Sequence, residues 1–230
     1  MKLKWILLAV LIFIVGYFLV LPAVEPSIPV NSVIRDGQVA VGDVFMLVNM
    51  SDMAIGQYDN ALTVNATDPA VLQKKAEALI KSGRTGEAEQ IYQTLLARDA
   101  NDPVALVRTG DLLYRQGDYT SAITAYDKAL AIVPNSSAVW LHKGDAYLVL
   151  SMQQEQKLHE IAKSLGKPDT DASVQPIESM ESYKQAVESY QKAMQLDPKL
   201  ALQVSTRMLG ATQYQVNEYQ SLLDDLKGGA

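Results

Sequence analysis

The amino-acid sequence predicts an all-α protein, namely a superhelical solenoid of antiparallel helix hairpins preceded by a single transmembrane helix. Three observations lead to this fold class. Residues recur every 34 positions, apolar residues within each repeat step by 3 and 4, and an uncharged apolar stretch lies near the N-terminus. The chain has 230 residues, enough for one domain and an appendage.

The N-terminal stretch from Trp5 to Val24 has the length and composition of a membrane span. It carries no charge, and about 20 apolar residues cross a bilayer core of roughly 30 Å. Lys2 and Lys4 precede it and Glu25 follows it, so the positive-inside rule leaves the N-terminus in the cytoplasm. Residues 1–24 are therefore expected to anchor a single-pass protein in the cytoplasmic membrane, with its repeats outside.

The alternative interpretation is a cleaved signal peptide, which would make the product secreted or periplasmic. Such signals have an apolar core of about 7–15 residues and an A-x-A-like cleavage site. This core is longer, and Leu21-Pro22-Ala23 departs from that site. Both interpretations export the domain. Residues 25–34 contain Pro26 and Pro29 and are expected to form an extended linker.

The 34-residue step is kept by four independent columns of residues. They are Ala54, Ala88 and Ala122; Tyr58, Tyr92 and Tyr126; Gly42, Ala76, Gly110 and Gly144; and Ala61, Leu95 and Ala129. A shared register of this kind is the signature of a repeat array, in which each unit buries its apolar face against its neighbours.

Each unit is predicted to contain two short amphipathic helices. In residues 103–136, Gln116-Gly117-Asp118 forms the turn, and the second helix ends at Pro134. Apolar residues mark the two helices at helical spacing: Leu106, Leu112 and Leu113 on the first, and Ala122, Ile123, Tyr126, Ala129 and Leu130 on the second. Gly110 and Ala122 are expected where the two helices cross closely.

The run GDLLYRQGDY at residues 110–119, followed by Ala122, Tyr126, Ala129 and Pro134, resembles the motif of the tetratricopeptide repeat family. The resemblance covers about residues 35–200 and is most specific at 103–147. It divides the array into four units, 35–68, 69–102, 103–136 and 137–200. In the first unit Asn49 stands where the family has a turn glycine.

The fourth unit is interrupted. The step from Ala122 to Ala186 is nearly twice the repeat, which places an insertion near 152–178. The first helix is expected to run on into it. The insertion is either a tolerated lengthening of a hairpin tip or an arm that contacts a partner. Residues 201–230 match the repeat poorly and are expected to form capping helices.

The composition argues against catalysis and metal binding. The chain has no cysteine and only two histidines, and the spacing of His142 and His159 puts them on different faces of one predicted helix. No catalytic or phosphate-binding motif occurs. We therefore expect no enzyme activity, cofactor, metal or small-molecule substrate. The net charge of −6 also argues against a nucleic-acid partner.

The resemblance implies that the first helices line a concave groove that binds a protein or peptide. An acidic row, defined as Asp43, Glu77, Asp111 and Asp145, follows the small residue of each repeat, and a basic row of Lys74, Arg108 and His142 lies three positions before it. These residues form either i,i+3 pairs along each helix or a groove presenting both charges. The apolar groove candidates are Met46, Ile80, Tyr114 and Leu148.

Some chaperone-associated members of that family grip a C-terminal carboxylate with basic and amide side chains. This chain carries Glu77 and Asp111 where such a clamp has asparagine, so no such clamp is expected. Three glycosylation sequons begin at Asn49, Asn65 and Asn135, all at predicted turns. The function predicted is a membrane-anchored protein–protein interaction scaffold.

Overall fold

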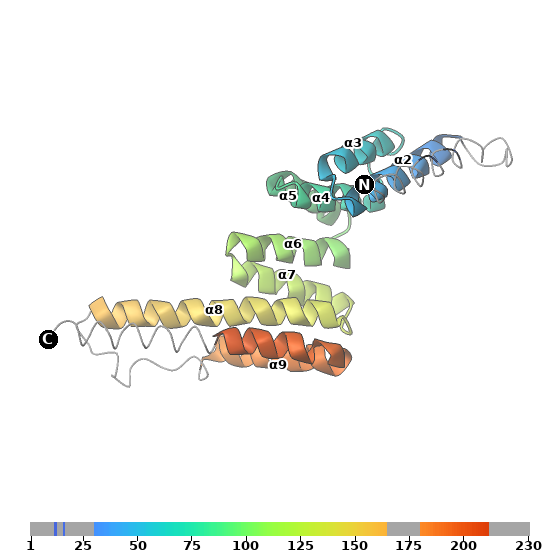
Figure 1. The fold of residues 1–230 in the computed structure, drawn as a ribbon. Helices are drawn as coiled ribbons and strands as arrows, with labels where there is room; N and C mark the ends of the chain where they lie inside the picture. The colour runs from blue at the N-terminus through green and yellow to red at the C-terminus, as the bar shows by residue number, and fades with distance from the viewer. Residues whose placement is uncertain (1–11, 13–15, 17–29, 165–179, 212–230) are drawn as a thin grey trace, which may run out of the picture. The chain divides into compact units, whose positions relative to one another are not determined.

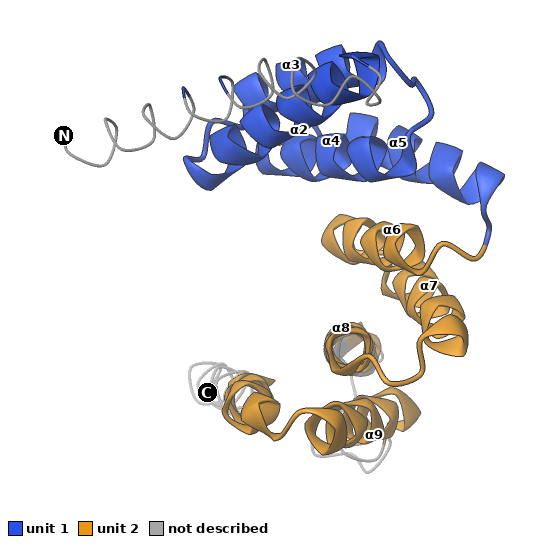
Figure 2. Ribbon diagram, turned by 90° about the vertical axis from the view of Figure 1, so that its right-hand side faces the viewer, with its two compact units in different colours: residues 1–100 blue, residues 101–230 orange. Residues whose placement is uncertain are grey.

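The computed structural model describes residue 12, residue 16 and residues 30–164 and 180–211. Within these residues all secondary structure is helical (Figure 1), which confirms the predicted all-α class. The chain divides into two compact units, residues 1–100 and 101–230 (Figure 2). The division falls between the second and third predicted repeats, so each unit holds two of them.

Unit 1 contains two helix hairpins. The first pairs α2 (Val30–Leu47) with α3 (Ser51–Leu62), and the second pairs α4 (Pro69–Lys81) with α5 (Thr85–Arg98). Helix α3 also packs on α4, so the hairpins share one core.

Unit 2 also contains two helix hairpins, and the first helix of the second hairpin is much longer than the others. Helix α6 (Pro103–Gln116) pairs with α7 (Tyr119–Ile132), and α8 (Ser137–Ser164) pairs with α9 (Glu181–Leu196). A short 3₁₀ helix, η2 (Pro198–Leu200), leads into a last described helix over 201–211. Helix α7 packs on α8. The described residues thus form four helix hairpins.

Local sequence signals set where these helices begin and turn. Asp68 and Asp102 cap α4 and α6 by accepting hydrogen bonds from two backbone N–H groups each, and a proline takes the first helical position. The turn residues Asn49, Gly83 and Gly117 all have a left-handed φ, of 64°, 83° and 85°. Asn49 therefore does take the place of the turn glycine, because asparagine tolerates this conformation better than most residues.

The core is organised around one tyrosine per repeat. The tyrosine rings of the second helices, Tyr58, Tyr92, Tyr126 and Tyr190, are almost completely buried. A Cβ atom added at Gly42, Gly110 or Gly144 would lie 2.5–2.6 Å from the ring of the tyrosine in the same hairpin. The small residue is thus required by the tyrosine ring, which is more specific than the close helix crossing that we expected.

The segment boundaries differ from the predicted ones at the N-terminal end of the array and agree with them at α8. Helix α2 begins at Val30, so residues 30–34, which we expected to be linker, are helical. The rest of the predicted linker, residues 25–29, lies outside the described residues. Helix α8 has 28 residues and runs on into the insertion as expected, ending at Ser164.

The predicted membrane span at residues 5–24 lies outside the described residues, apart from residues 12 and 16. In the part of the chain that the structure describes, the helices are too short or too polar to cross a bilayer. Of the predicted capping region 201–230, residues 201–211 are helical and the rest lies outside the described residues.

Candidate partner-binding site

The three aspartates of the acidic row each accept a hydrogen bond from a core tyrosine. The hydroxyl group of Tyr126 donates a hydrogen bond to Oδ1 of Asp111 at 2.9 Å. Tyr58 makes the same bond to Asp43 at 2.8 Å, and Tyr190 to Asp145 at 2.8 Å. Hydrogen bonds to a charged group contribute about 1.5–3 kcal/mol. Each bond joins the second helix of a hairpin to its first helix and fixes where the carboxylate lies.

Two of these aspartates contact a cation-forming side chain from the first helix of the next repeat. Lys74 on α4 donates to both carboxylate oxygens of Asp43 on α2 at 2.8 Å. Nδ1 of His142 on α8 lies 2.8 Å from Oδ1 of Asp111 on α6. The close contacts of Lys74 and His142 therefore link successive repeats.

This pattern partly corrects the i,i+3 pairing considered from the sequence. Arg108 keeps a contact of that kind, 3.4 Å between its Nη1 and Oδ2 of Asp111, whereas Lys74 and His142 reach back to the preceding repeat. The reason is geometric. In a stacked array, the turn of helix that bears the cation faces the preceding repeat, so the aspartate of that repeat is the nearer anion.

The last aspartate of the row receives its cation from outside the repeats. Nε of Arg207, in the helix over 201–211, lies 2.9 Å from Oδ1 of Asp145. Val204 and Ala211 of the same helix are buried against the α8–α9 hairpin. This helix therefore caps unit 2 in the position that the first helix of a further repeat would take.

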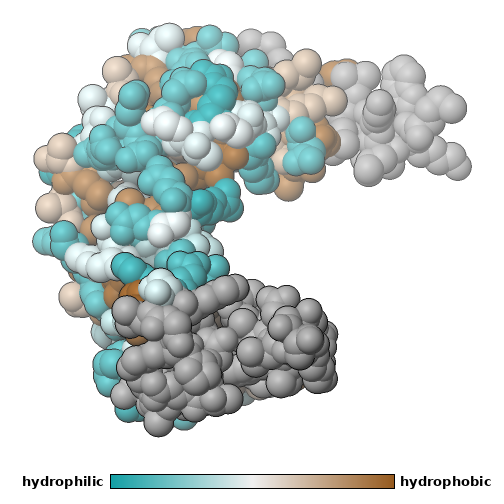
Figure 3. Space-filling model, turned by 90° about the vertical axis from the view of Figure 1, so that its left-hand side faces the viewer, coloured by the Kyte–Doolittle hydropathy of each residue, from teal (hydrophilic) through white to brown (hydrophobic). Residues whose placement is uncertain are grey.

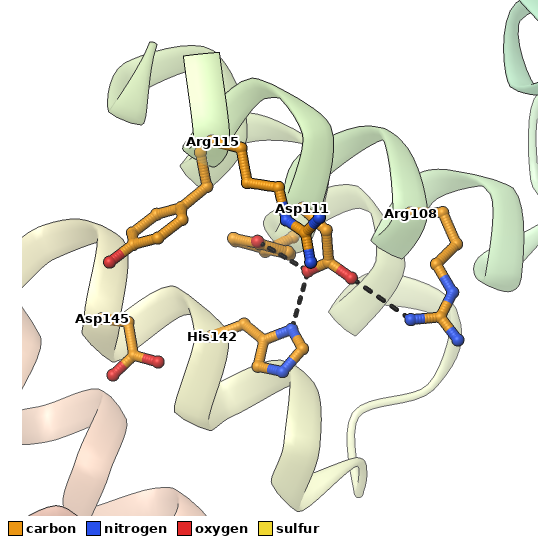
Figure 4. A pocket seen from close by; sticks show the side chains of 7 residues that line it. Arg108, Asp111, Arg115, His142 and Asp145 are labelled. Atoms are coloured by element: carbon orange, nitrogen blue, oxygen red, sulfur yellow. Dashed lines mark hydrogen bonds and ion pairs between the residues drawn. The ribbon is translucent and has the colours of Figure 1, made fainter. Parts of the chain in front are cut away.

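The residues of unit 2 enclose a pocket of about 330 Å³. Its lining comes from α6, α7 and α8 (Figure 4) and consists of Arg108, Asp111, Tyr114, Arg115, Tyr126, His142 and Asp145. All of these side chains can carry a charge or a hydrogen-bonding group. The pocket is therefore suited to polar and charged segments of a partner.

The two carboxylates of this pocket have different electrostatic environments. Burial disfavours the charged form of Asp111, but hydrogen bonds from His142 and Tyr126 and the charges of His142 and Arg108 outweigh it and hold its pKa below the usual value. Burial dominates for Asp145 and raises its pKa, although Tyr190 and Arg207 act in the opposite direction. Burial and the adjacent Asp111 raise the pKa of Tyr126, so its hydroxyl remains a donor.

The predicted groove residues can now be placed. The unit 1 candidates, Asp43, Met46, Lys74, Glu77 and Ile80, are all half-buried on α2 and α4. In unit 2, five of the six candidates line the pocket: Arg108, Asp111, Tyr114, His142 and Asp145. The placement of the sixth, Leu148, needs correction. It is 6% exposed and packs in a core cluster with Tyr190 of α9 and Val204 of the helix over 201–211.

Two residues of the site were missed. The spacing from Tyr190 to Arg207 is one residue longer than the spacing from Tyr58 to Lys74 or from Tyr126 to His142, and this shift hid Arg207 from the repeat. Arg115, which is exposed and lines the pocket, lies four positions after Asp111. One turn of helix separates them, which is the signal that would have indicated it.

Unit 1 has a hollow of its own, with a volume of about 350 Å³. Helices α4 and α5 and the segment before α4 line it: Ala66, Thr67, Leu72, Lys75, Leu79, Glu87, Gln90, Ile91, Thr94, Leu95 and Arg98. The sequence did not predict it.

On the face drawn in Figure 3, the coloured residues are mostly hydrophilic, with small hydrophobic areas between them.

The three sequon asparagines are exposed and lie at or beside turns. Oδ1 of Asn65 accepts hydrogen bonds from the backbone N–H and the hydroxyl group of Thr67. The positions are accessible, and their modification stays a prediction.

Comparison with known proteins agrees with the hairpin architecture. A tetratricopeptide repeat family model matches residues 73–137 and 107–151, and a second such model matches 178–200. No curated protein shows significant sequence similarity to the chain.

Among solved structures, MamA 41-end from Desulfovibrio magneticus RS-1 is 16% identical, with a TM-score of 0.56 over 84% of this chain and 92% of that one. A crystal structure of MamA is 16% identical, with a TM-score of 0.52 over 80% of this chain and 86% of that one. At this identity the similarity concerns the fold. The tetratricopeptide repeat models match the chain over residues 73–151 and 178–200, and the solved structures share its hairpin fold.

Proposed function

We propose that this chain is a protein–protein interaction scaffold whose unit 2 pocket captures a segment of a partner protein. The observation that carries the proposal is the arrangement of charge in the pocket. Asp111 and Asp145 are held by core tyrosines and by neighbouring basic side chains. Arg115 is exposed, and no ion pair involves it within the described part of the chain.

Arg115 sets the chemistry of the partner. A guanidinium group offers several donors in a fixed plane, which suits a carboxylate. Tyr114, at the preceding position, is half-buried and stacks edge-on with Tyr119 at 5.3 Å between ring centroids, so it offers a rigid apolar surface beside the cation. The partner segment therefore carries an acidic side chain next to an apolar one.

The test is site-specific photo-crosslinking in the native host. A benzophenone amino acid replaces Tyr114 in the pocket or, as a control, Lys128, which is exposed on α7. We expect a discrete adduct at position 114, identifiable by mass spectrometry, and a different pattern at 128.

The charge variant Arg115→Glu should abolish the adduct at 114, whereas Lys128→Glu, which makes the same charge change elsewhere, should leave it intact. The pocket hypothesis fails if both variants retain the adduct, or if position 128 captures the same protein equally well.

We further propose that residues 1–24 anchor the protein in the cytoplasmic membrane and place the repeats on the extracytoplasmic side. The support is the uncharged apolar sequence flanked by Lys2 and Lys4. Fractionation should give a full-length product in the membrane, with repeats degraded by protease added from outside. A shortened soluble product would instead support a secreted or periplasmic assembly factor.

A further inference from the structure

The three aspartate sites differ in the kind of cation that they receive. Asp43 receives Lys74 and Asp145 receives Arg207, and both side-chain types stay protonated throughout the physiological range. Asp111 receives His142. Histidine is the side-chain type that gains or loses its charge between about pH 5 and 8. The same structural position is therefore occupied by two permanent cations and one conditional cation.

The histidine is placed so that its charge matters. Its Nδ1 contacts Asp111 at 2.8 Å, and its ring stands edge-on to Tyr126 at 5.9 Å between centroids. The side chain is 35% exposed, so protons can reach it from solvent. The titratable and charged groups near it are Arg108, Asp111, Tyr114 and Arg115 on α6, Tyr126 on α7, Asp145 on α8 and, beyond Asp145, Arg207 of the helix over 201–211.

We propose that protonation of His142 regulates this pocket, because the imidazolium both ties α8 to α6 through Asp111 and adds a positive charge to the lining. The neutral imidazole can keep a hydrogen bond but loses the ionic attraction. The inference rests on the proposed function for its consequence on partner binding, while its structural part concerns the joint between the third and fourth repeats.

The charge balance gives the direction of the effect. With a neutral imidazole, the guanidinium groups of Arg108 and Arg115 balance the carboxylates of Asp111 and Asp145. With an imidazolium, the lining carries a net positive charge. Asp111 remains ionised during this change because its pKa lies below the usual value. Mild acidification therefore tightens the joint and favours an acidic partner segment.

The composition of the chain makes the effect measurable. The sequence has two histidines and no cysteine, so few groups titrate between pH 5 and 8. The imidazole signals of His142 and His159 can be followed by NMR on the full-length protein in detergent. His142→Lys identifies the signal of His142, so protonation of this imidazole can be followed directly.

Thermal unfolding of four full-length proteins at pH 8 and pH 5.5 tests the joint. The variant His142→Lys installs a permanent cation, as Lys74 provides at the sister site. The difference in midpoint between wild type and His142→Lys should move in favour of the wild type by about 2–4 °C between pH 8 and pH 5.5. Groups that titrate in both proteins cancel in this difference.

The reciprocal variant Lys74→His should make the stability of unit 1 depend on pH in the same way. It should be less stable than wild type at pH 8 and recover part of the loss at pH 5.5. His159→Gln is the control and should keep a constant difference from wild type. If the wild-type and His142→Lys midpoints differ equally at both pH values, the inference is overturned.

These measurements need no partner, so their failure is separate from a failure of the proposed function. Crosslinking at position 114 at the two pH values then tests whether protonation of His142 affects partner capture. An adduct that forms equally at pH 8 and pH 5.5 supports the pocket and contradicts its regulation, whereas a stronger adduct at pH 5.5 that becomes pH-independent in His142→Lys supports both.

Discussion

The Asp43 site of unit 1 and the Asp111 site of unit 2 have the same parts but different surroundings. Each aspartate follows a glycine, accepts a hydrogen bond from a core tyrosine and contacts a basic side chain of the next repeat. The Asp43 side chain is 42% exposed, and that of Asp111 is 20% exposed. Solvent screens the first site more strongly, so the same contacts contribute less there.

The two repeats thus share the geometry of the site, while the energetic contribution of the same contacts differs between them. The two tyrosine–aspartate bonds are nearly equal in length, 2.8 Å at Asp43 and 2.9 Å at Asp111. At Asp111, however, two further side chains, His142 and Arg108, converge on the carboxylate. The unit 2 site should therefore respond more strongly to substitution than the unit 1 site.

The largest effect is expected where the glycine meets the tyrosine ring. Gly110→Leu forces a side chain against Tyr126, whose ring already lies 2.6 Å from the position of an added Cβ atom. We expect a loss of about 3 kcal/mol in the free energy of unfolding, measured with denaturant. The control is Gly86→Ala in α5, where nothing lies within 4 Å; it should gain about 0.5–1 kcal/mol from helix propensity. Equal responses would refute the packing argument.

The tyrosine hydroxyl groups test the comparison directly. Tyr126→Phe removes the donor to Asp111 and should lower the free energy of unfolding by about 1.5–3 kcal/mol, as expected for a bond to a charged group. Tyr58→Phe removes the equivalent bond at the more exposed Asp43 and should cost less, about 0.5–1.5 kcal/mol. A larger loss for Tyr58→Phe would reverse our ranking of the two sites.

The two carboxylates of the unit 2 pocket should show opposite pH dependence. The pKa of Asp111 is lowered by folding, so its stabilising contribution is present above the ordinary value of 3.8 and is lost as the pH falls through the folded value. The pKa of Asp145 is raised, so ionisation of Asp145 costs stability as the pH rises through that region.

The measurement is the difference in unfolding free energy between wild type and each of Asp111→Asn and Asp145→Asn, from pH 7 down to pH 2.5. The advantage of wild type over Asp111→Asn should shrink as the pH falls. Relative to Asp145→Asn, wild type should gain stability over the same range. Parallel curves would show that burial does not separate the two residues.

The smallest effect concerns the turns. Asn49 holds a left-handed φ of 64° in unit 1, where Gly117 holds 85° in unit 2. Asn49→Gly should stabilise unit 1 by about 0.5–1 kcal/mol, and Gly117→Asn should cost about the same, because glycine has no Cβ atom to strain. Denaturant midpoints suffice to measure both. A loss of stability in Asn49→Gly would show that the asparagine side chain makes a contact of its own.

Much of the fold was predictable because the 34-residue repeat is visible in the amino-acid sequence. The columns of Tyr58, Tyr126 and their neighbours located the hairpins, and Asn49 was correctly identified as a turn residue. The i,i+3 pairing did not predict the close contacts of Lys74 and His142, because contacts between repeats depend on how hairpins stack, which periodicity within one helix does not encode.

The rest of the site depended on interruptions of the repeat. Arg207 was missed because the step from Tyr190 is one residue longer than elsewhere. Leu148 was misplaced because it packs in a core cluster that includes Tyr190 of α9 and Val204 of the helix over 201–211. The division of the array after Ala100 left no signal in composition or spacing.

The ion pair between Arg207 and Asp145 also limits how easily this array could lengthen in evolution. Repeat proteins lengthen by duplication of whole units, and a new unit needs a free docking face. Here the helix over 201–211 already fills that face and neutralises the terminal acid. A duplicated repeat inserted after Leu196 would have to displace this helix first. The helix over 201–211 therefore opposes the addition of further repeats.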